Sequence, residues 1–272
     1  MKVSVVIPTY NGVDFVETTL ESVLNQTFSD FEIVVSDDAS TDGTVEVVGR
    51  INDPRVSILK DRSHVGPGGN WNRALAQARG EYVKVLAQDD LLYQDNLQVA
   101  VDVLDSDPAL SFVAMRRDII GAKGTVVLRD RGLSGLCGLI DPVDGYRATV
   151  RSGANPFGEG EAVLFRRTAS EQAGGFDESL PYAIDIDYWL RLLSWGPAFG
   201  LCSTHAAFRV TAQSWSNTLV REQGRQFAAL IDRVANDPAH GVTQADILIG
   251  KGRAKANAQL RRLFYARYRS EL

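Results

Sequence analysis

The apolar stretch VSVVI at residues 3–7, closed by Pro8, has the composition of a β-strand that is buried on both faces. Similar stretches follow as FEIVVS at residues 31–36 and YVKVLA at residues 82–87, with a shorter one at residues 56–59. Predicted helices lie between them. Strands and helices that alternate over connections too long for hairpins predict an α/β fold, with a mainly parallel sheet covered by helices on both faces.

After residue 110 the pattern changes to short β-like segments between glycine-rich loops, with one predicted helix at residues 186–195. We expect these segments to complete a mixed sheet, so that residues 1–110 and 111–216 are two halves of one domain. Residues 217–272 read as a C-terminal helical extension with a break at residues 236–241 (NDPAHG).

The formal net charge of −5 is unevenly distributed over the 272 residues. Residues 251–272 contain seven Lys or Arg residues and one Glu, so the rest of the chain carries a net charge of −11. Such an acidic body argues against a general nucleic-acid-binding protein, which needs a basic face. No apolar run reaches the roughly 18 residues of a membrane span, and the N-terminus does not read as a secretory signal. We therefore expect a cytoplasmic protein in which Cys137 and Cys202 are free, buried thiols.

Acidic side chains recur where ligands bind in sheets of this kind. The pairs are Asp37-Asp38, Asp89-Asp90 and Asp185-x-Asp187. The first two follow strands, so they should share one edge of the sheet with residues 9–11. One such pair is often only a turn former or helix cap. Two neighbouring pairs call for a compensating cation, and Mg²⁺ or Mn²⁺ held by carboxylate, phosphate and water oxygens fits. No Cys or His spacing indicates zinc.

A glycine-rich phosphate loop is the alternative anion site. The sequence GPGGN at residues 66–70 precedes a predicted helix. It matches neither of the common phosphate-loop patterns, so a flexible loop or tight turn is the simpler interpretation.

Six segments taken together resemble the successive motifs of the family-two glycosyltransferases with the GT-A fold. They are VSVVIPTYN (residues 3–11), SDDASTDGT (36–44), GNWNRAL (69–75), AQDD (87–90), GGFDE (174–178) and DIDYWLRL (185–192). The resemblance covers roughly residues 1–215. It implies transfer of a sugar from a nucleoside-diphosphate sugar, with UDP or dTDP as the expected nucleotide, onto a glycan or lipid-linked acceptor with inversion. Residues 1–110 would bind the donor, and residues 111–216 would build the acceptor side.

The resemblance also assigns residues to the donor site. Pro8, Thr9 and Tyr10 would line the nucleobase pocket, and Asp38 would accept a hydrogen bond from the base. Asn72 would help to hold the nucleotide.

The same resemblance places Asp89 at the ribose, Asp90 at the Mn²⁺ or Mg²⁺ ion and Asp185 as the general base. At a predicted helix N-terminus Asp185 is expected to stay ionised. Ile184 replaces the usual Glu before this base, and Thr211 replaces a frequent His. Metal affinity should therefore be weak without nucleotide.

Three residues in the second half are candidates for contacts with the acceptor. Glu159 and Glu161 lie in a glycine-rich segment, and Trp215 follows the last β-like segment. Ordinary packing would also explain Trp215, because buried aromatic residues are common. Asp187, beside the predicted base, is expected to cap the helix or form a salt bridge.

Two other functions stay open at this point. A nucleotidyltransferase should carry a basic glycine-rich loop after its first strand, where this chain has Pro8-Thr9-Tyr10-Asn11-Gly12. A non-catalytic sugar- or nucleotide-binding homologue is the other alternative.

The basic C-terminal segment has a helical apolar pattern at Leu260, Leu263, Phe264 and Tyr268. Such a helix would suit peripheral contact with an anionic membrane. The alternative is a helix packed on the catalytic domain with its charges in water.

Overall fold

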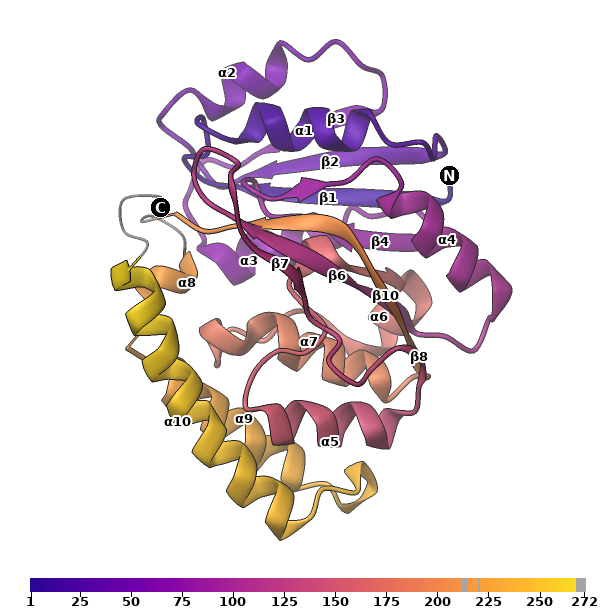
Figure 1. Ribbon diagram of the computed structural model, residues 1–272. Coiled ribbons are helices and arrows are strands. Elements are labelled where there is room, and N and C mark those ends of the chain that lie inside the picture. The colour runs from indigo at the N-terminus through magenta and orange to yellow at the C-terminus, as the bar shows by residue number, and fades with distance from the viewer. Residues whose placement is uncertain (212–214, 220, 268–272) are drawn as a thin grey trace.

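The computed structural model describes residues 1–211, 215–219 and 221–267, which form helices around one large mixed sheet (Figure 1). The strands are β1 (Val3–Thr9), β2 (Phe31–Asp37), β3 (Val56–Lys60), β4 (Tyr82–Val85), β5 (Leu91–Leu92), β6 (Phe112–Ile120), β7 (Val126–Arg131), β8 (Gly138–Ile140), β9 (Val163–Arg166) and β10 (Ala198–Arg209). The α-helices are α1 (Val16–Leu24), α2 (Thr44–Gly49), α3 (Pro67–Leu75), α4 (Asn96–Ser106), α5 (Pro142–Ser152), α6 (Arg167–Ala173), α7 (Ile184–Leu193), α8 (Trp215–Thr218), α9 (Gln223–Ala235) and α10 (Gln244–Arg267). Short 3₁₀ turns are η1 (Gly160–Ala162), η2 (Pro181–Ala183) and η3 (Pro238–His240).

The described strands follow the order β3-β2-β1-β4-β9-β6-β10-β5, with β7 beside β6 and β8 beside β10. Strands β1 to β4 pair in parallel, as do β6 and β10, whereas β9 runs antiparallel between β4 and β6. The predicted mixed sheet is thus confirmed. The register of β1 on β2 sets Thr9 opposite Asp37, so the carboxyl ends of these strands lie at the same edge.

Both faces of the sheet are covered, as predicted. Val3, Val5 and Ile7 of β1 pack in the cluster that holds α1 and α4. Val6, which points to the opposite face, joins the cluster that holds α3 and α7. This alternation explains why β1 reads as a continuous apolar run, since neither of its faces meets water.

The second half contains more regular structure than the sequence predicted. Helices α4, α5 and α6 were not predicted, and β10 is a strand of 12 residues where the sequence predicted only short β-like segments. The helical C-terminal segment and its break at η3 are confirmed. Helix α10 packs against α5 and α9, and the domain boundary at residue 216 stays a prediction. Among the helices that the structure describes, none is long and apolar enough to cross a membrane.

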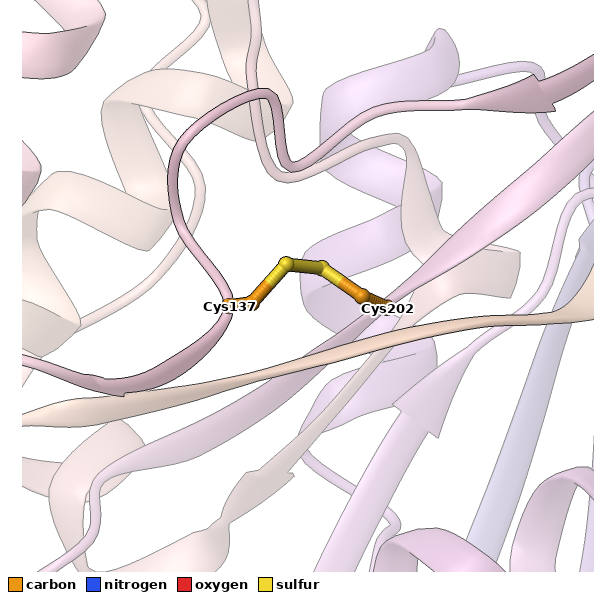
Figure 2. The surroundings of a disulfide bond; sticks show 2 residues. All are labelled: Cys137 and Cys202. Carbon is orange, nitrogen blue, oxygen red and sulfur yellow. A yellow bond between two sulfur atoms is a disulfide. The ribbon is translucent and has the colours of Figure 1, made fainter.

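Cys137 and Cys202 form a disulfide bond, so the prediction of free thiols is wrong (Figure 2). Their Cα atoms lie 5.5 Å apart although the residues are separated by 65 positions. The antiparallel pairing of β8 with β10 sets Gly138 opposite Gly200 and so brings both cysteines within reach. Distance along the chain carried no information about this pairing.

We predict that loss of the disulfide lowers the free energy of unfolding by about 2–4 kcal/mol, because the bond closes a long loop in the unfolded chain. Urea unfolding of the protein with and without a thiol-free reductant measures this change. A Cys137→Ser, Cys202→Ser double variant is the control, and reductant should leave its midpoint unchanged. Equal midpoints for the oxidised and reduced wild-type protein would contradict the prediction.

Candidate active site

The loops after β1, β2 and β4 meet at one edge of the sheet, as predicted from the strand pattern. The Gln88 side chain accepts a hydrogen bond from the Tyr10 backbone N–H at 2.9 Å and donates one to the Tyr10 carbonyl at 3.0 Å. The Thr9 hydroxyl donates to Asp37 at 3.0 Å, and the Asp38 backbone N–H donates to the Thr9 carbonyl at 2.9 Å. These bonds fix the three loops relative to one another.

A cavity of about 580 Å³ opens at this edge. The charged residues that line it include Asp89, Asp90, Arg117, Glu159, Asp185 and Arg209. The apolar residues that line it include Trp71, Tyr182, Trp215, Leu219, Phe227, Leu260 and Phe264. Residues far apart in the sequence, Asp90 and Asp185 among them, therefore face one space.

Asp90 is buried at the floor of the cavity. Its Oδ1 accepts a hydrogen bond from the Arg209 backbone N–H at 2.7 Å, and the Arg209 Nε donates to the Asp89 carbonyl at 2.7 Å. Burial raises the pKa of Asp90 well above its usual range, and repulsion from Glu161 and Asp89 adds to this rise. Burial also raises the pKa of Asp89 to about 6. A bound cation would relieve this crowding of negative charge.

The carboxylates of the cavity suit a metal ion that a bound ligand also coordinates. Within the described part of the chain, no group of three or more His, Cys, Asp or Glu side chains could hold a metal ion. Asp89 and Asp90 offer carboxylate oxygens to the cavity. Mg²⁺ and Mn²⁺ accept one or two such ligands when phosphate and water supply the others. The residues therefore fit a divalent ion bound together with a nucleotide.

A buried ion cluster lies beside Asp90. The Arg117 guanidinium of β6 places Nη2 at 2.6 Å from Glu159 and Nε at 3.3 Å from Glu161. The buried Lys84 ammonium donates to the carbonyls of Glu161 and Val163, at 2.8 and 3.0 Å. Burial raises the pKa of Glu161 to about 8, with a further contribution from Glu159, and lowers the pKa of Lys84 to about 7. Arg117 thus neutralises carboxylates that would otherwise repel one another.

The glycine at position 160 allows this arrangement. A Cβ atom there would lie 2.0 Å from the Val85 carbonyl oxygen. Only a residue without a side chain lets η1 lie directly on β4, and this close approach carries Glu159 and Glu161 to Arg117.

Asp185 lies in the first turn of α7, with its side chain at the cavity. Its Oδ1 is buried and makes no hydrogen bond to any residue in the described ranges. Burial raises the pKa of Asp185 well above its usual range; Glu159 and Glu161 add to the rise, and Arg117 opposes it. Burial therefore acts on the pKa of Asp185 in the opposite direction to the effect expected of the helix N-terminus.

Asp187, two residues later, has a structural role. Its carboxylate pairs with Arg191 at 2.9 Å and with Arg233 at 2.8 Å, and only 3% of the side chain is exposed. The expected salt bridge is confirmed. Asp187 links α7 to α9, whereas Asp185 faces the cavity.

Asp38 is covered by the loop that precedes α3. Its carboxylate accepts the backbone N–H groups of Val65 and Gly66 at 2.8 and 3.0 Å, and the His64 Nδ1 lies 2.8 Å from Oδ2. The His64 ring lies 4.1 Å from the Tyr10 ring, centroid to centroid. With Asp38 1% exposed, a nucleobase would reach it only after this loop moves.

The other residues assigned to the nucleobase pocket differ in accessibility. Pro8 and Thr9 are buried at the end of β1, and the Thr9 hydroxyl is engaged by Asp37. Tyr10 is 44% exposed and is the member of this group that can present its side chain to a ligand.

Asn72 lies outside the cavity that Asp89, Asp90 and Asp185 line, and its contact with the nucleotide stays a prediction. Its Oδ1 accepts the Phe176 backbone N–H at 2.6 Å, and its Nδ2 donates to the Phe176 carbonyl at 3.0 Å. Both ends of the amide are therefore used to attach the glycine-rich loop at residues 174–176 to α3.

The three candidates for the acceptor side are placed differently. Glu159 and Trp215 line the cavity, and the Trp215 ring packs edge-on against Trp71 with centroids 6.3 Å apart. Glu161 is fully buried and does not line the cavity, so a direct contact with an acceptor does not fit its position.

The sequence analysis assigned no role to Lys84, Arg117 or Arg209. Each is a charged residue in or at the end of a strand, and each is buried. A charge inside an apolar strand pattern, such as Lys84 within YVKVLA, was the signal available, because such a charge needs a partner.

The sheet order and the carboxylate-lined cavity define a protein of the GT-A class. Residues 4–173, more than half of the chain, match the model of Glycosyl transferase family 2. The chain belongs to this family.

Similar proteins include named bacterial enzymes. Chondroitin synthase of Escherichia coli is 29% identical over 200 residues, which span 72% of this chain and 27% of that protein. GalNAc(5)-diNAcBac-PP-undecaprenol beta-1,3-glucosyltransferase of Campylobacter jejuni is 43% identical over 94 residues, which span 34% of this chain and 30% of that protein. The chain thus covers about a third or less of the length of these relatives.

A solved structure with the same fold is the mannosyltransferase of Pyrobaculum calidifontis in complex with GDP-Man and Mn²⁺. It superposes with a TM-score of 0.67 at 23% identity, over 97% of this chain and 75% of that chain. At this identity the likeness establishes the fold.

We predict that Arg117→Met lowers the free energy of unfolding by about 3–5 kcal/mol, because it leaves buried carboxylates without their cation. Since the pKa of Glu161 is about 8, its protonated form dominates below that pH in the folded protein. Because the pKa of Glu161 is 4.5 in the unfolded chain and about 8 in the folded protein, the cost in stability builds up between about pH 4.5 and pH 8. In the variant, with a still higher pKa, the loss of stability should continue above pH 8. Urea unfolding at pH 6.5 and pH 9 measures both effects.

Arg131→Met is the matched control for this experiment. Arg131 lines the same cavity but is exposed, so its loss should change stability little. Equal destabilisation by the two substitutions would show that Arg117 does not hold the cluster together.

Proposed function

We propose that this chain transfers a sugar from a nucleoside-diphosphate sugar to a hydroxyl group of a glycan or lipid-linked acceptor, with inversion at the anomeric carbon. The observation that carries the proposal is the presence of Asp90 and Asp185 in one cavity. Membership of the family supports it. The relatives extend well beyond the matched segment, so the activity of the whole protein rests on this proposal.

The donor would lie with its diphosphate at Asp89 and Asp90. A Mn²⁺ or Mg²⁺ ion held there would neutralise charge on the departing diphosphate. Asp90 is oriented for this role by the Arg209 N–H. Tyr10 would face the nucleobase, and Asp38 would become accessible once residues 64–66 move. UDP or dTDP is our choice of nucleotide, and GDP is the alternative that the mannosyltransferase complex supports.

Asp185 would take the proton of the acceptor hydroxyl. In a single step the acceptor oxygen bonds to the anomeric carbon, the bond from that carbon to the diphosphate oxygen breaks, and the proton passes to the Asp185 carboxylate. A raised pKa makes this carboxylate a stronger base once it is ionised. Glu159 is paired with Arg117, which leaves Asp185 as the base and favours one displacement with inversion.

The location of the protein belongs to the same proposal. We place it in the cytoplasm, with the exposed and basic side of α10 as the surface for peripheral contact with an anionic membrane. Arg262 and Leu263 are exposed on this helix. Tyr268, the last residue of the apolar pattern, lies outside the described residues.

We predict that nucleoside diphosphate and Mn²⁺ bind cooperatively, because Asp89 and Asp90 supply too few ligands to hold the metal alone. Isothermal titration of UDP, dTDP and GDP with Mn²⁺, with Mg²⁺ and in EDTA measures the coupling. Asp90→Asn should abolish the metal dependence. Equal nucleotide affinity in EDTA and in Mn²⁺ would remove the metal role and with it the assignment of Asp90.

We predict that Asp185→Asn lowers the rate of sugar transfer by about 10²–10⁴ while nucleotide affinity stays nearly unchanged, because the amide cannot accept the proton. In the wild type, transfer should increase as the pH rises through the raised pKa of Asp185, at a pH above the usual range of an aspartate. Steady-state rates against pH with a confirmed acceptor measure both effects.

Asp187→Asn is the matched control, since it alters the same turn of α7 but faces Arg191 and Arg233. It should lower stability and retain most of the transfer rate. Wild-type turnover by Asp185→Asn, or an equal loss in both variants, would overturn the assignment of the base.

A further inference from the structure

Helix α10 is fixed to α5 by ionic contacts at its start. The buried Asp246 carboxylate accepts hydrogen bonds from Arg147 at 3.2 Å and from Arg151 at 3.0 Å. Both arginines belong to α5. Because both carboxylate oxygens are engaged, the first turn of α10 has one position on α5.

The two helices then approach closely. A Cβ atom on Gly250 would lie 2.1 Å from the Val150 carbonyl oxygen, so the backbones are in contact there. About two turns further on, the Asn257 amide donates to the carbonyls of Ser152 and Gly153, at 3.0 and 3.1 Å. These contacts set the rotation of α10 about its own axis as far as Asn257.

Beyond α5 the same stripe of α10 reaches the cavity. Leu260, Arg261 and Phe264 lie three, four and seven residues after Asn257, which puts them on one face of the helix, and all three line the cavity. The Arg261 guanidinium lies over the Tyr182 ring at 5.5 Å. The face that α5 orients is thus the face that borders the candidate active site.

Helix α10 contributes two apolar side chains, Leu260 and Phe264, to a wall of the cavity. It also contributes Asn257 and Arg261, whose N–H groups are engaged by Ser152, Gly153 and Gln223. Leu260 is 62% exposed, and Trp71, Tyr182 and Trp215 line the same cavity. A sugar hydroxyl gains no hydrogen bond from Leu260 or Phe264, whereas an alkyl or prenyl group would remove their surface from water. The wall is continuous with the space that holds Asp185, so one ligand would span both.

We infer that α10 forms an acceptor-binding wall, and that the acceptor carries an apolar group close to the hydroxyl that receives the sugar. This inference adds the class of acceptor to the proposed function. It rests on the proposed function only in calling the bound molecule an acceptor. Binding of an apolar glycoside to the wall can be measured without any donor or turnover.

The probe is n-octyl β-D-glucopyranoside below its micelle concentration, with methyl β-D-glucopyranoside as the polar comparison. Tryptophan fluorescence reports binding, because Trp71 and Trp215 line the cavity. The measurements use a Trp195→Phe background, since Trp195 is 52% exposed outside this cavity and would add an unrelated signal. We expect saturable binding of the octyl glycoside and none of the methyl glycoside over the same range.

Leu260→Asp should weaken binding of the octyl glycoside by about tenfold or more, because a carboxylate would replace apolar surface in the wall. Leu248→Asp is the matched control, since Leu248 is 79% exposed on the same helix and does not line the cavity. It should bind like the parent. Phe264→Ala, measured with the same probe, tests the wall without adding a charge and should also weaken binding.

Equal affinity in Leu260→Asp and the parent would overturn the inference, and so would an equal loss in Leu260→Asp and Leu248→Asp. The proposed function has a separate outcome. If UDP, dTDP and GDP all fail to bind with Mn²⁺ while the octyl glycoside still depends on Leu260, the donor assignment fails and the apolar wall stands. If the nucleotides bind normally with Mn²⁺ and binding of the octyl glycoside does not depend on Leu260, the apolar wall fails and the donor assignment stands.

Discussion

Several carboxylates lie at the cavity or directly beneath it and repel one another, and the Arg117 guanidinium is the cation that offsets their charge. It contacts Glu159 and Glu161 directly, and its charge is felt by Asp185. The contacts depend on Gly160, which lets η1 lie on β4. A buried ion pair stabilises a fold only when its geometry is good, so this cluster requires β6, which carries Arg117, and η1, which lies on β4, to keep a fixed separation. The pKa of Asp185 depends in part on the same charges, because Glu159 and Glu161 raise it and Arg117 lowers it.

Much of the fold could be predicted because its first strands are buried on both faces. β1, β2 and β4 read as largely apolar, β-branched runs, interrupted only by Ser4, Glu32 and Lys84 before their carboxyl ends, and this pattern has few alternatives. The sequence AFGLCSTHAAFR of β10 has small and polar residues instead, and its place in the sheet comes from pairing with β6 and β8. Helix α5 carries few apolar residues and is held by α7, α9 and α10. Tertiary contacts of this kind leave little trace in local sequence.

The residues of the candidate site also fall into those that the sequence predicted and those that it did not. Asp89, Asp90 and Asp185 stand out as residues of acidic motifs, and the structure brings them to one cavity. The positions of Asp38 and Asn72 were harder to foresee, because their partners lie on other elements. Asn72 binds the backbone of Phe176, more than a hundred positions away, and Asp38 binds the loop before α3. A motif indicates which residue types are present, and only the fold shows which of them a ligand can touch.

The segment that matches the family model ends at residue 173, before Asp185, Trp215 and α10. The parts that would hold the nucleotide therefore precede, in the chain, the parts that would choose what receives the sugar. Such a division would let donor binding and acceptor choice diverge independently during evolution. Recombination after α6 would exchange Asp185, Trp215 and α10 as one block. The exchanged block would also contain Arg209, whose backbone N–H orients Asp90, so a chimaera joined there would keep the proposed donor site only if the new segment supplied an equivalent of β10.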